Sequence, residues 1–142
     1  MDDLQDFLDE LCADLIEYQA LVSELDGTAR GLRDRAGLEA AVSRPFQTGA
    51  GGHSLFLGPA EKAAAIADSI IRHQPFVDGN KRVAAMAAGR MLDRYGLDLI
   101  AHPVEFAEMI LWLDQGTVTL DGFADWLDDH CLPLWPDKGP IG

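Results

Sequence analysis

Apolar residues recur at helical spacing along almost the whole chain, and no other feature constrains the fold as strongly. In the first 26 residues they are separated alternately by four and by three positions, at Leu4, Leu8, Leu11, Leu15, Tyr18, Val22 and Leu25. This spacing predicts an amphipathic helix, and because it stops near Asp26 we expect the helix to dock on its own domain rather than to form a coiled coil. Similar patterns predict a short helix ended by Pro45 and longer helices at 60–73, 80–95, 104–115 and 120–129.

No stretch of useful length alternates between apolar and polar residues, and no segment is repeated. We therefore predict a single all-α domain of five to seven helices over residues 1–132. The prolines and glycines of residues 133–142 predict an irregular tail.

The charge balance narrows the set of partners. The 142 residues include 24 acidic and 11 basic side chains, a net charge of −13, so we expect no direct binding to nucleic acid or to a membrane surface. Charged residues interrupt every apolar run, which predicts neither a transmembrane helix nor a secretory signal. Cys12 and Cys131 lie far apart without metal-ligand spacing, which favours a cytoplasmic protein with free thiols.

The segment 46–58 contains four glycines together with His53, Leu55 and Phe56. A loop of this length with apolar content is often functional. The residues alone leave two interpretations open, an ordinary loop fixed by Phe56 or a flap that receives a ligand or peptide.

The residues with useful chemistry concentrate between the two most apolar predicted helices. The segment His73-Gln74-Pro75-Phe76-Val77-Asp78-Gly79-Asn80-Lys81-Arg82 ends where a helix is expected to begin. The free backbone N–H groups of a helix start attract phosphate, and glycine allows a close approach of the backbone.

Residues 72–94 contain five of the eleven basic side chains and only two acids, a local charge of +3. This contrast with the acidic remainder favours a small anionic ligand. Asp78 then has two possible roles, as a Mg²⁺ ligand beside the phosphates of a nucleotide or as an ion-pair partner of Lys81 or Arg82 at a surface turn.

The same segment resembles the motif of the Fic/Doc family, and within it the Doc-like branch of toxins from toxin–antitoxin systems. Seven positions match in register, namely Pro75, Phe76, Asp78, Gly79, Asn80, Lys81 and Arg82. Upstream segments at 31–34, 38–41, 44–45 and 60–64 also look like the Doc branch, so that the resemblance covers roughly residues 30–127.

The resemblance implies an all-α Fic/Doc fold with a flexible flap before the central helix pair. It implies that Asp78 holds Mg²⁺ on a nucleoside triphosphate such as ATP, while Gly79, Asn80, Lys81 and Arg82 bind the phosphates. Arg82 is also expected to act in catalysis, by stabilising charge as the transferred group departs. Phe76 is expected to anchor the loop in the core. The target flap falls on Phe46, Gln47, Thr48, His53, Leu55 and Phe56.

The resemblance also implies an activity and partners. Fic adenylyltransferases usually have a second glycine where this chain has Lys81, and a lysine there goes with phosphoryl transfer in the Doc branch. The target is expected to be a hydroxyl on a protein of the translation machinery, such as an elongation factor, and the second partner a small antitoxin protein.

One position departs from the motif. The catalytic histidine of the family falls on Gln74, which cannot act as a general base, and the nearest imidazole is His73. The chain is then a catalytically silent relative that only binds nucleotide or a partner, or carries a substitution that suppresses toxicity, or brings His73 to the site through a local bulge. The bulge is the least expected, because one residue along a helix rotates a side chain by about 100°.

Overall fold

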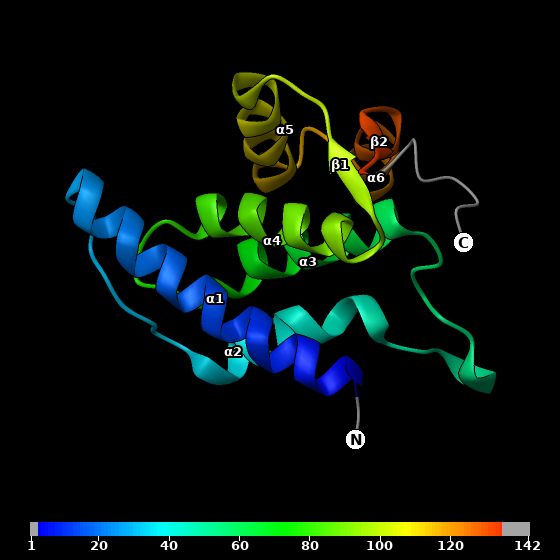
Figure 1. The fold of residues 1–142 in the computed structure, drawn as a ribbon, viewed down its shortest axis with the longest axis horizontal. Coiled ribbons are helices and arrows are strands. Elements are labelled where there is room, and N and C mark those ends of the chain that lie inside the picture. The colour runs from blue at the N-terminus through cyan, green and yellow to red at the C-terminus, as the bar shows by residue number, and fades with distance from the viewer. Residues whose placement is uncertain (1–2, 135–142) are drawn as a thin grey trace.

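The computed structural model describes residues 3–134 and shows three layers of helices (Figure 1). The central layer is the pair α3 (Pro59–His73) and α4 (Asn80–Arg94). On one side lie α1 (Asp3–Asp26) and α2 (Arg35–Ser43), and on the other α5 (Pro103–Gln115) and α6 (Leu120–Asp129). Two 3₁₀ turns, Arg44–Phe46 and Ala50–Gly52, lie between α2 and α3. The all-α prediction is confirmed, and no helix in the described range is both long and apolar enough to cross a membrane.

Small side chains place α3 and α4 at the centre. Nine of the fifteen residues of α3 are buried, and five of these are alanines. Ala84, Ala87 and Ala88 of α4 are fully buried. Small residues allow two helix backbones to approach closely, so that α3 and α4 form the most extensive contact in the fold.

Helix α1 docks on this core as predicted, but its buried face differs from the predicted stripe near its C-terminal end. Leu8, Leu11 and Leu15 are buried, whereas Leu25 is 79% exposed. Gln19 and Ser23 are buried in place of the expected apolar positions, because this end of α1 meets polar backbone rather than the apolar core.

No strand was expected from the sequence, but the described residues include two of them. Strand β1 (Leu97–Leu99) pairs antiparallel with β2 (Cys131–Pro133), and Leu97 lies opposite Pro133. Strands of three residues are too short to show alternation in a sequence. Strand β2 includes Pro133, the first residue of the predicted tail, and residues 135–142 of that tail lie outside the described range.

The loop between α3 and α4 is held from two sides. The carboxamide of Asn80 accepts a hydrogen bond from the Phe76 N–H at 2.9 Å and donates one to the Phe76 carbonyl at 3.0 Å. On the other side, the Val77 N–H donates to the Gly31 carbonyl at 2.9 Å, and the Arg33 N–H donates to the Pro75 carbonyl at 2.7 Å. The Phe76 ring is 1% exposed, as expected of an anchor.

Phe76→Ala is expected to lower the free energy of unfolding by about 3–5 kcal/mol, because it leaves a cavity under the loop. Urea denaturation of the purified protein measures this change. Val77→Ala is the matched control, since the Val77 side chain next to it is 54% exposed and is expected to cost well under about 1 kcal/mol. Equal losses in the two variants would contradict the anchoring role.

Candidate functional site

A pocket of about 710 Å³ lies between the α3–α4 loop and helix α5. This volume suits a ligand of nucleotide size. The lining residues are Ile71, Gln74, Val77, Asp78, Gly79, Asn80, Lys81, Arg82, Ala85, Pro103, Phe106, Ala107, Ile110, Leu111 and Asp114. Gln74 and the five consecutive residues from Asp78 to Arg82, all candidates from the sequence, therefore line one pocket.

The polar side of the pocket is the start of α4. Gly79 precedes the helix with φ of +75°, a left-handed conformation that favours glycine, and its N–H donates to the Asp78 carboxylate at 2.8 Å. Lys81 and Arg82 follow in the first turn, where unpaired N–H groups favour anions. The Asn80 carboxamide bonds the Phe76 backbone through both of its polar atoms, so its side chain shapes the loop as well as lining the pocket.

The apolar side of the pocket was not anticipated from the sequence. Phe106, Ile110 and Leu111 of α5 line it, together with Ala85 of α4. A flat ring system buries favourably against such a wall. The available signal was the spacing of 103, 107, 110 and 114, which places these positions on one face of the predicted helix.

The local positive charge predicted for residues 72–94 is largely compensated by acids from outside that segment. The Lys81 ammonium lies 3.8 Å from the Asp114 carboxylate of α5. The Arg82 guanidinium pairs with Asp26, the last residue of α1. Arg72 and Arg90 likewise pair with Asp68 at 3.3 Å and Asp14 at 2.7 Å. Both predicted phosphate-binding cations thus already have a carboxylate partner.

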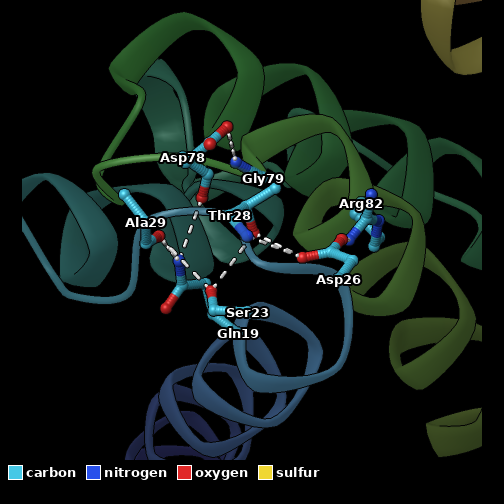
Figure 2. A network of polar contacts seen from close by, with 8 residues as sticks. All are labelled: Gln19, Ser23, Asp26, Thr28, Ala29, Asp78, Gly79 and Arg82. Carbon is cyan, nitrogen blue, oxygen red and sulfur yellow. Dashed lines mark hydrogen bonds and ion pairs between the residues drawn. The ribbon is translucent and has the colours of Figure 1, made fainter.

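Asp26 belongs to a polar network that ties α1 to the motif loop (Figure 2). Its carboxylate accepts hydrogen bonds from the Thr28 hydroxyl at 2.7 Å and the Thr28 N–H at 3.0 Å. These bonds, and then the bond from Arg82, lower the pKa of the Asp26 carboxyl from 3.8 to about 2.

The buried Gln19 carboxamide completes the network. Its amide nitrogen donates to the Ala29 carbonyl at 2.9 Å and to the Asp78 carbonyl at 3.1 Å, while its oxygen accepts the Gly31 N–H at 3.1 Å. Helix α1 therefore holds the backbone of the residue expected to bind the metal, and through Asp26 it holds Arg82 (Figure 2).

Gln74 caps the C-terminal end of α3, directly after its last residue, in a left-handed conformation with φ of 47° and ψ of 59°. This conformation is uncommon for a residue other than glycine. Its carbonyl accepts a hydrogen bond from the Arg33 Nε at 3.1 Å, and the residue lines the pocket. The structure therefore places Gln74 at the pocket, in the position where the resemblance implies a general base.

His73 is not brought to the pocket. It is the last residue of α3, and its Nδ1 lies 2.9 Å from the carbonyl of Ser69 one turn earlier. It does not appear among the lining residues, because α3 continues without a bulge through this position. Nothing in this geometry supports the bulge that would carry the imidazole into the site.

The candidate flap forms a small hairpin. The Leu55 N–H donates to the Gln47 carbonyl at 3.1 Å, the Gly49 N–H donates to the His53 carbonyl at 2.8 Å, and Thr48 bridges to Ser54. The two aromatic rings at its ends lie near arginines, Phe56 at 5.5 Å from Arg44 and Phe46 at 5.9 Å from Arg94.

None of the six candidate flap residues lines the pocket. The hairpin precedes α3 and the motif loop follows it, and a helix of 15 residues is about 22 Å long. Figure 1 shows the two at opposite ends of α3. The structure therefore does not bring the flap to the motif, and the role of these residues in binding a target stays a prediction.

No group of three or more histidine, cysteine, aspartate or glutamate side chains in the described part of the chain could hold a metal ion by itself. Magnesium at nucleotide sites is usually held by one or two carboxylates together with substrate phosphates. The exposed Asp78 carboxylate at the pocket fits that more limited role.

The fold and the motif loop define a class of protein. A model of the Fic/DOC family matches residues 3–92, and the chain belongs to this family. The chain is also 41% identical over 102 residues to toxin Doc of Mycolicibacterium smegmatis (strain ATCC 700084 / mc(2)155). The match covers 66% of this chain and 78% of that toxin. The resemblance seen in the motif is therefore confirmed.

Thr28→Ala is expected to raise the pKa of the Asp26 carboxyl from about 2 toward its ordinary value of 3.8. The substitution removes the hydrogen bond from the Thr28 hydroxyl, the largest single cause of the lowered pKa, and leaves the bond from the backbone N–H in place. Arg82→Met should also raise the pKa, because it removes the bond and the charge of the guanidinium. A pH titration of the side-chain carboxyl carbon by NMR measures both values.

The sign of the effect on stability follows from the direction of the shift. A lowered pKa stabilises the fold above the unfolded value and loses this contribution as the pH falls, here between about pH 4 and pH 2. An unchanged pKa in Thr28→Ala would contradict the network.

Proposed function

We propose that this protein is a Doc-like toxin whose pocket binds a nucleoside triphosphate such as ATP together with Mg²⁺. The proposed reaction is transfer of the terminal phosphoryl group to a hydroxyl of a protein target, and in this chain the reaction is impaired by Gln74. The observation that carries the proposal is the convergence of Gln74 and residues 78–82 on one pocket that has an apolar wall.

Each polar residue has a role that its position supports. The start of α4 presents N–H groups and the Arg82 guanidinium to phosphate oxygens. Lys81 adds a charge where adenylyltransferases of the family usually have a glycine, which favours phosphoryl over nucleotidyl transfer. Asp78 would hold the metal, which supplies neutralisation of phosphate charge when bound.

The step that this chain is expected to perform poorly is removal of the proton from the attacking hydroxyl. A carboxamide does not accept that proton at any useful pH, and a positioned general base contributes about 10²- to 10⁴-fold to such a transfer. Gln74 therefore leaves a site that can bind and orient its substrates without efficient proton removal.

Two alternatives remain within the same pocket. A catalytically silent module that binds nucleotide or a partner is favoured by Gln74. An adenylyltransferase is the second alternative, and Lys81 argues against it.

The relationship to a toxin Doc supports a proposal about the biological partners. We propose a small antitoxin protein as the binding partner and a protein of the translation machinery, such as an elongation factor, as the target. Both would meet the chain in the cytoplasm, where ATP is abundant.

Gln74→His is expected to raise transfer of label from γ-labelled ATP to proteins of a bacterial lysate by at least about 100-fold, because it restores a general base. Autoradiography of the lysate proteins measures the transfer. The control is Gln74→His combined with Asp78→Asn, which should remove the gain.

The position of the label separates the alternatives. Label from the α position in Gln74→His, or only after Lys81→Gly is added, would indicate an adenylyltransferase. No transfer by any variant despite ATP binding would leave the silent module, and absence of ATP binding would contradict the proposal as a whole.

A further inference from the structure

The charges that line the pocket cancel one another. Among the described residues, the lining contains two acids, Asp78 and Asp114, and two bases, Lys81 and Arg82. Arg82 is also paired with Asp26, whose carboxylate lies outside the lining. The formal charge of the pocket is therefore zero, and with Asp26 it is −1, although the sequence around the motif is basic.

Asp114 is the acid that neither the motif nor the family relationship assigns to the site. It lies in the last turn of α5, and its Oδ2 is 3.8 Å from the Lys81 Nζ. The Asp114 side chain is 33% exposed and that of Lys81 55% exposed, so that the pair is open to a ligand at the pocket.

The end of α5 is fixed against the motif independently of this pair. The Arg72 guanidinium, on the last turn of α3, donates to the Leu113 carbonyl at 2.9 Å and to the Asp114 carbonyl at 3.4 Å. These bonds involve the backbone of α5, and a change of the Asp114 side chain leaves them intact. Asp114 is thus held opposite the start of α4 whatever the charge of its side chain.

We propose that Asp114 is a specificity-determining residue that makes the pocket select a nucleoside triphosphate in complex with a divalent cation over the metal-free nucleotide. The inference rests on the proposed function and adds a residue to it. A metal-free triphosphate carries two more negative charges than its Mg²⁺ complex, and Asp114 repels it more strongly because Coulomb energy scales with the charge of the ligand. Asp114 also pairs with the Lys81 ammonium, which would otherwise attract the phosphates of the metal-free nucleotide.

Asp114→Asn is expected to tighten binding of metal-free ATP by about fivefold and of MgATP by about twofold, in proportion to their charges. Isothermal titration calorimetry of the full chain, with ATP in EDTA and with ATP in excess Mg²⁺, measures both affinities. The preference for the metal complex should therefore fall by about half or more in Asp114→Asn.

Asp14→Asn is the matched control. Asp14 pairs with Arg90 at 2.7 Å, its side chain is 34% exposed, and neither residue lines the pocket. This variant changes the net charge of the protein by the same amount and should leave both affinities as they are.

The outcomes separate this inference from the proposed function. ATP binding to the unmodified chain with an unchanged metal preference in Asp114→Asn would overturn the role of Asp114 and leave the proposed function standing. The same change in Asp14→Asn as in Asp114→Asn would also overturn it, since the effect would then belong to the net charge. If no form of ATP binds to the unmodified chain, both proposals fail.

Discussion

The two hydrogen bonds between the Asn80 carboxamide and the backbone of Phe76 are the constraint on which the rest of the site depends. They close the loop between α3 and α4 around a buried ring, and they fix where α4 begins. Asp78 and Gly79 lie inside this closed loop, so their backbone is set before any ligand arrives. A preformed loop of this kind lowers the entropy that binding must overcome.

Acids from distant parts of the chain compensate the positive charges of the motif. Helix α1 reaches the motif through Gln19 and Asp26, and α5 reaches it through Asp114. An isolated helix start with Lys81 and Arg82 would attract any small anion. The surrounding acids reduce this general attraction. In the proposed function, selectivity would then come from the shape of the apolar wall and from the metal that accompanies the phosphates.

Much of the fold could be predicted from the sequence, because the helices keep their apolar residues at regular spacing and the motif residues are contiguous at one helix start. Asp26 and Asp114 could not be identified in the same way, since their proximity to Arg82 and Lys81 arises from packing between helices far apart in the chain. The two three-residue strands are too short for a periodic pattern. Gln74 was identified from the motif alone, while the place of His73 outside the pocket required the uninterrupted course of α3.

We propose that the pocket between the motif loop and α5 is the nucleotide site. The most direct test is a titration of isotopically labelled protein with MgATP, in which NMR measures the shifts of the backbone amide resonances. The account predicts that the largest shifts fall on Gly79, Lys81 and Arg82 and on the lining residues of α5, with the hairpin before α3 unaffected. Shifts confined to the hairpin or to α6, or no shifts at saturating MgATP, would contradict it.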